Sequence, residues 1–451
     1  MAYASTNPYT NELLAEFPYA SDAEVDAALA TAQSAFESWS RLPVAERAVY
    51  VRRAAELMRE RREELARIAT LEMGIVYESS LVHAGTVGPG ILDFYADNAE
   101  AFLAPERLGE HTLVVREPTG IVFAIEPWNA AYYQPIRATA GNLMAGNVVI
   151  LKHASIVPQS SAAVARLFAD AGLPAGVFTN LYATHEQTSR IIADERVRGV
   201  TMTGSDQAGR RIAAAAAAAV KPAVLELGGA DAMVVLGDAD IEKATDAAMS
   251  RFRMCGQICV SPKRMIVVDA AYDAFIKRFR DKAARLVPGD PLEPGVSIGP
   301  LSSQSQADIV SDQIERAVAG GAAAIPVGGR VPAHGAFVQP TILLEMDAEN
   351  PVYYEEIFGP VPEIFWAKDV DDAVRIANDT KYGLGGSVFS ANVELAEDVA
   401  RRIDTGMVWI NQVAGTAPSL PFGGTKASGY GTELGRDGIY GFVNNKLIHR
   451  P

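Results

Sequence analysis

The sequence predicts an α/β protein with two doubly wound, Rossmann-like α/β domains and a small β-ribbon element. Helical patterns alternate with short apolar, β-branched runs such as residues 147–152, and this alternation is typical of parallel sheets covered by helices. The 451 residues are enough for about three domains of ~150 residues each. Hydrophobic residues make up 49% of the chain and charged residues 21%, as in an ordinary compact soluble protein.

The N-terminal part of the chain begins with helices. Ser21 followed by acidic residues is typical of a helix N-terminus, and this helix should run to about Trp39. Amphipathic helices should follow over residues 41–73 and 90–102. Residues 111–125 then predict a strand, a turn and a second strand. Because an isolated hairpin is marginally stable in water, we expect this ribbon to pair with another segment.

The next segment has polar side chains at the ends of strands. An apolar strand ends at Ile125 and is followed by Glu-Pro-Trp-Asn, and a second strand ends at Lys152. Open parallel sheets bind ligands at the carboxyl ends of their strands. There the Asn129 amide could donate a hydrogen bond to an oxyanion, although a turn asparagine explains the residue equally well. A cation at Lys152 suits contact with a ligand.

A further strand, residues 199–202, leads into Thr203-Gly204-Ser205 and a helix. Such a helix N-terminus can bind phosphate groups, but the same pattern is commonly just a capped turn. The following alanine-rich helix leads to an apolar segment around Glu226. Burial there would raise the pKa of the carboxyl group and suit a general base near neutral pH. Alternatively, this residue ends a strand or pairs with a lysine.

Both cysteines of the chain, Cys255 and Cys259, lie in a turn between a helical pattern and a β-branched run. A nucleophilic thiol needs a partly exposed, electropositive setting, and Arg253, Lys263 and Arg264 flank this turn. A cysteine is nevertheless more often a small buried hydrophobe. The turn is therefore a candidate active site whose assignment depends on the rest of the chain.

Composition excludes several classes of function. The formal net charge of −15 disfavours nucleic acid as a partner, since phosphate binding needs a basic face. Two cysteines cannot form a disulfide framework, and the first ten residues lack signal-peptide features. The longest apolar run, residues 212–220, is too short to span a bilayer, so we expect a cytoplasmic protein. The six histidines have no metal-ligand spacing, and we expect no metal site.

Two motifs resemble the aldehyde dehydrogenase superfamily. They are Glu-Leu-Gly-Gly at residues 226–229 and Gly-Gln-Ile-Cys at residues 256–259, and the similarity extends over essentially the whole chain. It implies the aldehyde dehydrogenase fold, with Cys259 as the nucleophile and Glu226 as the general base. It also implies that Asn129, in Pro-Trp-Asn, is the oxyanion donor.

The resemblance further implies a dinucleotide cofactor. In Glu-Glu-Ile-Phe-Gly-Pro, Glu356 would hold the nicotinamide ribose and Phe358 would pack on the nicotinamide. Ser155 stands where many NAD-preferring members have a Glu that repels a 2′-phosphate, so we expect NADP or NAD, with NADP at least as effective. The implied cofactor-binding residues are Ile125, Pro127, Trp128, Lys152, Ser155, Thr203, Gly204, Ser205, Leu227, Gly228, Glu356 and Phe358.

Two arginines direct the expectation about the substrate. Arg137 and Arg253 match arginines that bind the substrate carboxylate in family members acting on succinate semialdehyde, and Arg suits a bidentate carboxylate contact. Alternatively, each pairs with a local acid. The resemblance predicts oxidation of succinate semialdehyde to the acid through a cysteine thiohemiacetal and thioester, with uncharged aliphatic or aromatic aldehydes as the alternative. A cofactor-free thiol hydrolase and a non-catalytic dinucleotide-binding protein fit the residues less well.

The remaining expectations concern a proton relay, the assembly of subunits and the limits of the domains. Glu433 falls where many members carry a Glu, for which the resemblance implies a role in relaying protons from the base, and Met254 departs from the Asn that many members have. In relatives the ribbon reaches another subunit, so we expect a homodimer or homotetramer. The expected parts are a dinucleotide-binding domain (1–107 and 125–229), a catalytic domain (230–420) and an oligomerisation element (108–124 and 430–451).

Overall fold

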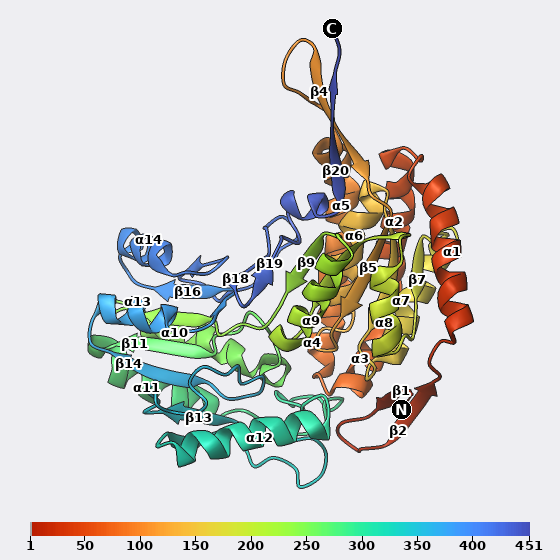
Figure 1. Ribbon diagram of the computed structural model, residues 1–451. Coiled ribbons are helices and arrows are strands. Elements are labelled where there is room, and N and C mark those ends of the chain that lie inside the picture. The colour runs from red at the N-terminus through yellow and green to blue at the C-terminus, as the bar shows by residue number, and fades with distance from the viewer. Residues whose placement is uncertain (1) are drawn as a thin grey trace.

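The computed structural model describes residues 2–451. The chain is organised around two helix-covered sheets, and a narrow β-ribbon projects from the body of the molecule (Figure 1). Most strand pairs within the two large sheets are parallel, and the predicted α/β architecture is confirmed. Within residues 2–451, no helix has the length and apolar character needed to cross a membrane.

The first sheet has six strands in the order β19-β9-β8-β5-β6-β7. Its inner strands are apolar on both faces because helices cover both sides, and every residue of β6 is buried. The parallel register brings the carboxyl ends of β5, β8 and β9 side by side, at Glu126, Thr203 and Glu226. The strands are β5 (Ile121–Glu126), β6 (Val148–His153), β7 (Phe178–Asn180), β8 (Val197–Thr203), β9 (Ala223–Glu226) and β19 (Gly429–Tyr430).

Helices from the N-terminal half of the chain surround this sheet. The predicted start of the first helix is confirmed, because Ser21 forms a capping box with Glu24. The helices expected over residues 41–73 and 90–102 are also present. The helical segments are α1 (Asp22–Trp39), α2 (Val44–Glu60), α3 (Arg62–Met73), α4 (Tyr77–Val82), the π-helical turn η1 (His83–Val87), α5 (Gly88–Leu103), α6 (Tyr133–Ala145), α7 (Pro158–Asp170), α8 (His185–Ala193) and α9 (Asp206–Ala218).

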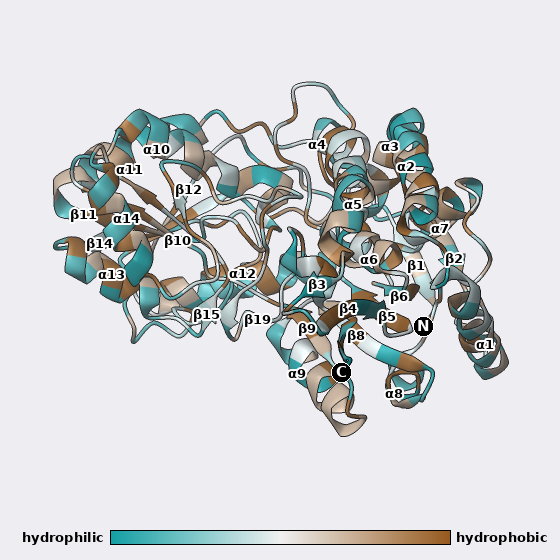
Figure 2. Cartoon of the chain, turned by 90° about the horizontal axis from the view of Figure 1, so that it is seen from above, coloured by the Kyte–Doolittle hydropathy of each residue, from teal (hydrophilic) through white to brown (hydrophobic). Residues whose placement is uncertain are grey.

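The second sheet has seven strands in the order β12-β13-β14-β11-β10-β16-β17. Bands of teal and brown alternate along its outer helices in Figure 2, as expected for helices with one buried face. The strands are β10 (Ala232–Val235), β11 (Arg264–Val268), β12 (Ala323–Pro326), β13 (Thr341–Leu344), β14 (Glu363–Ala367), β16 (Gly386–Phe389) and β17 (Trp409–Ile410), and the helices are α10 (Ile241–Ala248), η2 (Met249–Gly256), α11 (Asp269–Ala283), α12 (Gln304–Ala319), α13 (Val370–Asn378) and α14 (Val393–Arg402). Three short elements complete the chain: β15 (Tyr382–Gly383), β18 (Thr425–Lys426) and η3 (Asp437–Tyr440).

The β-ribbon consists of β3 (Glu106–Arg107), β4 (Thr112–Pro118) and β20 (Val443–His449), and it extends away from the body (Figure 1). β4 pairs along its whole length with β20, so the expected partner segment is confirmed. The expected hairpin over residues 111–125 was wrong, because the strand after the turn is β5 of the six-stranded sheet. This strand is largely buried and apolar, which suits a central parallel strand rather than a two-stranded ribbon.

An unpredicted hairpin lies at the N-terminus, formed by β1 (Tyr3–Thr6) and β2 (Leu13–Phe17). Its strands are too short to show a clear alternating pattern. The backbone N–H of Ala4 donates to the carbonyl of Ser155 at 3.0 Å, so the hairpin lies beside the segment that follows β6. The division into three parts stays a proposal, with the ribbon ending before β5 rather than at residue 124.

Candidate active site

Cys259 follows a turn with an unusual run of backbone conformations. Near the end of η2, Met254, Cys255 and Gly256 have φ angles of 49°, 53° and 75°. The left-handed conformation costs a non-glycine residue about 1 to 2 kcal/mol, and Asn tolerates it better than Met. A side chain at Gly256 would collide with the carbonyl group of Gly359. Met254 is therefore less suited to its backbone conformation than an Asn would be.

Two cavities meet at the Cys259 thiol. Their volumes are about 360 Å³ and about 270 Å³, and Asn129, Gln134 and Cys259 line both. The larger cavity has a mostly apolar wall that includes Val82, Val87, Ala130, Tyr133, Met254, Ile258, Val413 and Phe422. A small apolar molecule in the larger cavity and a second ligand in the smaller one would therefore both reach the sulfur.

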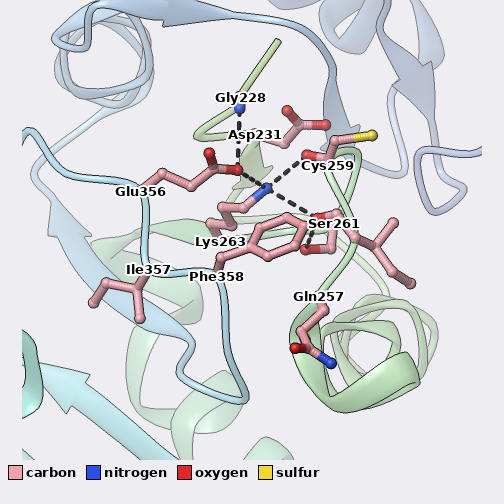
Figure 3. Close-up of polar contacts among 12 residues, drawn as sticks. Gly228, Asp231, Gln257, Cys259, Ser261, Lys263, Glu356, Ile357 and Phe358 are labelled. Carbon is pink, nitrogen blue, oxygen red and sulfur yellow. Dashed lines mark hydrogen bonds and ion pairs between the residues drawn. The ribbon is translucent and has the colours of Figure 1, made fainter. Parts of the chain in front are cut away.

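Burial dominates the electrostatics of the nucleophile candidate. It raises the pKa of the Cys259 thiol to about 11. The positive charges of Arg137 and Lys263 lower this pKa, while the carboxylates of Asp231 and Glu356 raise it further. Lys263 also donates to the Cys259 carbonyl oxygen at 2.6 Å (Figure 3). The thiol is thus protonated in this state, and nearby cations favour its ionisation.

Cys255 has a different environment. Its side chain is buried in the hydrophobic core around the seven-stranded sheet, lines neither cavity, and has its pKa raised to about 12 by burial. Beside it, the buried Arg251 donates to the Gly256 carbonyl at 2.7 Å and to the Ser261 hydroxyl at 2.9 Å. The interpretation as a small buried hydrophobe therefore fits Cys255, whereas Cys259 has access to both cavities.

The amide of Asn129 lies beside the nucleophile turn. Its Nδ2 donates to the carbonyl of Gln257 at 3.0 Å, and its Oδ1 accepts from Gln134 at 3.3 Å. The residue follows β5, as its sequence position predicted, and it is buried at the junction of the cavities. An amide held in this place can donate to an oxygen that becomes negative when the thiolate attacks a carbonyl group.

Three buried carboxyl groups cluster around one arginine behind this junction. Arg137 forms an ion pair with Glu433 and donates to the Thr203 hydroxyl at 2.9 Å. Burial raises the pKa values of Glu126 and Glu226 well above their ordinary value; Glu433 adds to both shifts and Arg137 opposes them. Within residues 2–451, no hydrogen bond reaches the carboxylate oxygens of Glu126 or Glu226. Both groups therefore favour the protonated state.

The base candidate is close to the cavities without lining them. Glu226 ends β9, and the next residues, Leu227 and Gly228, line the smaller cavity. The Glu226 side chain is in neither cavity wall and is 2% exposed. The charge of Glu433 acts on Glu226, so the structure brings these two carboxyl groups near each other. Within residues 2–451, no hydrogen bond joins Glu226 to Cys259.

The two arginines expected to bind a substrate carboxylate occupy different places. Arg253 is exposed and lines the larger cavity. Arg137 lies behind the wall, with its guanidinium 5.1 Å from the Tyr133 ring centre and 4.6 Å from that of Phe422. The placement expected for Arg137 is therefore corrected, because Glu433 already compensates its charge. The alternative of a local acid partner applies to Arg137.

Most of the expected cofactor residues surround the smaller cavity. Its wall contains Pro127, Trp128, Thr203, Gly204, Ser205, Leu227, Gly228, Glu356 and Phe358. Three others lie outside this wall: Ile125 and Lys152 pair across β5 and β6, and Ser155 is exposed nearby. Burial lowers the pKa of Lys152 to about 8, and its ammonium lies 5.7 Å from the centre of the Tyr3 ring. This setting suits an anionic ligand.

Two residues of the site escaped the sequence reasoning. Glu126 ends a buried strand, and the same position at the end of a strand identified Glu226 as a candidate. Only the neighbours of Glu126, Ile125 and Pro127, were predicted to belong to the site. His83 lines the larger cavity and begins the π-helical turn η1, and nothing in the local sequence indicates either property. In residues 2–451, no group of three His, Cys, Asp or Glu side chains could hold a metal ion.

Comparison with known proteins accounts for this combination of fold and site. The profile of the aldehyde dehydrogenase family matches residues 1–448, and the chain belongs to this family. The family, the fold and the class of enzyme, an NAD(P)-dependent aldehyde dehydrogenase, are thereby confirmed.

Its relatives include several proteins of one named activity. The NADP(+) succinate-semialdehyde dehydrogenase of Deinococcus radiodurans is 43% identical over 452 residues, covering 99% of this chain and 94% of the relative. The probable NADP(+) succinate-semialdehyde dehydrogenase of Synechocystis sp. is 39% identical, with 99% of each chain covered. The crystal structure of succinic semialdehyde dehydrogenase from Streptococcus pyogenes in complex with NADP+ matches with a TM-score of 0.97 at 40% identity, with 100% of each chain covered.

Proposed function

We propose that this aldehyde dehydrogenase oxidises succinate semialdehyde to the acid, with NADP or NAD as cofactor. The observation that carries the proposal is the presence of Arg253 in the wall of the larger cavity, which Cys259 also lines. A cation on an otherwise mostly apolar cavity suits a short chain with an aldehyde at one end and a carboxylate at the other. The names of the relatives from Deinococcus radiodurans and Synechocystis sp. support this substrate.

The proposed chemistry assigns one task to each polar group. The Cys259 thiol first loses its proton to solvent, and the thiolate attacks the aldehyde carbon while the Asn129 amide and the Cys259 backbone N–H donate to the oxyanion. A nicotinamide, when bound, would accept the hydride that turns the thiohemiacetal into a thioester. Glu226, in its ionised form, then takes a proton from the water that attacks the thioester carbon; the C–S bond breaks, the acid leaves and Cys259 is released as the thiolate. Glu433, which pairs with Arg137 and whose charge acts on Glu226, is the candidate to pass this proton on.

The cofactor site supports NADP as well as NAD. Gly228 leaves room for the Glu356 side chain, because a Cβ at Gly228 would collide with that carboxylate. Ser205 caps α9, whose N-terminus suits a pyrophosphate. Lys152 is a buried cation without an ion-pair partner in residues 2–451, and the exposed Ser155 adds no negative charge beside it. These two residues favour a ligand that carries a 2′-phosphate.

Assembly and location are part of the proposal. The ribbon exposes apolar side chains, among them Leu108, Leu447 and Ile448, and such a surface supports a homodimer or homotetramer. Both cysteines are free, and a required free thiol is best maintained in a reducing compartment such as the cytoplasm.

An uncharged aliphatic or aromatic aldehyde is the second candidate substrate, favoured by the apolar wall of the larger cavity. A comparison of kcat/KM for succinate semialdehyde and an uncharged aldehyde of similar length, with NADP, separates the two. We expect Arg253→Ala to lower kcat/KM roughly a hundredfold for succinate semialdehyde only, since a charged hydrogen bond is lost. Arg401→Ala, at an exposed position on α14, is the matched control. Equal losses on both aldehydes, or a wild type that prefers the uncharged one, would contradict the carboxylate contact.

A further inference from the structure

The ammonium group of Lys263 is buried in the site, where it makes two hydrogen bonds and an ion pair. It stands just before β11 and is 2% exposed. Its Nζ donates to the carbonyl oxygens of Ile258 (3.1 Å) and Cys259 (2.6 Å) and lies 3.1 Å from Oε1 of Glu356 (Figure 3). A lysine ammonium has three N–H groups; two of them donate these hydrogen bonds, and the charge pairs with the Glu356 carboxylate. The side chain is fixed, and its charge has a fixed position.

These contacts join two parts of the site that come from distant parts of the sequence. Ile258 and Cys259 form the nucleophile turn, whereas Glu356 lines the smaller cavity and accepts a hydrogen bond from the Gly229 N–H at 3.2 Å. The Phe358 ring, which also lines this cavity, lies 5.8 Å from Nζ. One cation thus contacts the backbone of the nucleophile and the carboxylate of the cofactor cavity.

We propose that Lys263 is a positioning residue that couples the Cys259 thiol to the state of Glu356 in the cofactor cavity. This inference rests on the proposed roles of Cys259 and Glu356. A ligand that binds the Glu356 carboxylate competes with Lys263 for it, and so changes the net charge that the sulfur experiences. The coupling needs no movement of the nucleophile turn, because it acts through charge while Lys263 keeps its hydrogen bonds to the carbonyl oxygens of Ile258 and Cys259.

Charges from several elements act on this pair. The thiol is influenced by Arg137 and Lys263, which lower its pKa, and by Asp231 and Glu356, which raise it; Tyr133 also faces the thiol. Lys263 itself faces three acids: Glu356, Asp231 and Glu363. Removal of the Lys263 cation should therefore raise the thiol pKa, and neutralisation of Glu356 should lower it. The opposite signs distinguish electrostatic coupling from a general loosening of the site.

The test measures the pH dependence of Cys259 alkylation by iodoacetamide, with the modified peptide identified by mass. We expect Lys263→Met to move the midpoint to higher pH and Glu356→Gln to move it to lower pH, each by roughly one pH unit. Lys263→Arg, which keeps the charge, should lie nearer to the wild type. Lys368→Met, at an exposed position outside the site, is the control and should not change the midpoint.

Several outcomes would overturn the proposal. They are a Lys263→Met midpoint equal to that of the wild type, or shifts of Lys263→Met and Glu356→Gln in the same direction. Should Lys263→Met fail to fold, Glu356→Gln decides alone, and an unchanged midpoint in that variant rejects the coupling. The assay contains neither aldehyde nor cofactor. A chain that shows the opposite shifts but does not oxidise succinate semialdehyde would therefore refute the proposed substrate and leave the coupling intact.

Discussion

Two charged clusters, one around Lys263 and one around Arg137, act on the Cys259 thiol, and they differ in how their polar atoms are hydrogen-bonded. In the ammonium cluster, Lys263 donates hydrogen bonds to the Ile258 and Cys259 carbonyl oxygens and forms an ion pair with Glu356. In the carboxyl cluster, the oxygens of Glu126 and Glu226 have no hydrogen-bond partner in residues 2–451. A side chain that holds other groups in place gains from saturated hydrogen bonds, whereas a group that must gain and lose a proton cannot be locked by them. The first cluster suits positioning and the second suits proton transfer.

The largest effect should come from removing the proton acceptor. Glu226→Gln should keep a first burst of reduced nicotinamide and lower steady-state turnover by roughly 10² to 10⁴, the usual contribution of a general base. Rapid-mixing absorbance measurements separate the burst from the steady state, and Cys259→Ala, which should show neither phase, is the control. A Glu226→Gln variant that turns over at nearly the wild-type rate would remove Glu226 from the role.

The ion pair in the carboxyl cluster should be structural. Arg137→Met leaves Glu433 buried without its partner, and the loss of one member of a buried pair costs roughly 3 to 5 kcal/mol of stability. Denaturant unfolding should detect this loss, and Arg253→Met, at an exposed position, should be close to the wild type. The double variant Arg137→Met with Glu433→Gln should recover much of the loss. Similar stabilities for Arg137→Met and Arg253→Met would refute this assignment.

The smallest effect concerns the pH dependence of stability. Burial and, next, Glu433 raise the pKa of Glu126, opposed by the charge of Arg137, while Glu226 adds to the increase. A raised carboxyl pKa favours the folded state below the unfolded pKa, and this benefit is lost as the pH rises through the folded pKa.

Glu126→Gln stays neutral at every pH, so its melting temperature should equal that of the wild type near pH ~5 and exceed it by roughly 1 to 3 degrees at alkaline pH. Thermal melts across this range test the expectation. A difference that does not depend on pH would show that Glu126 is ionised in the folded protein or that its pKa is unshifted.

Local chemistry explains why much of the fold was predictable. The capping box at Ser21 and Glu24 and the fully buried strand β6 depend on neighbouring residues and on periodicity. The hairpin β1–β2 and the identity of the strand that pairs with β4 have no comparable signal in the local sequence. Two strands of four and five residues carry almost no alternating pattern, and the partner of β4 is more than 300 residues further along the chain.

The sequence alone determined the residue types that the chemistry needs: a thiol in a Gly-Gln-x-Cys turn, an acid ending an apolar strand, and an asparagine after another strand. Only the tertiary structure decided which arginine faces the cavity, because Glu433 meets Arg137 from a segment almost 300 residues away. The same holds for Lys263, whose partner Glu356 comes from a different segment. Motifs record local backbone and side-chain requirements, whereas the compensation of a buried charge depends on every segment that packs against it.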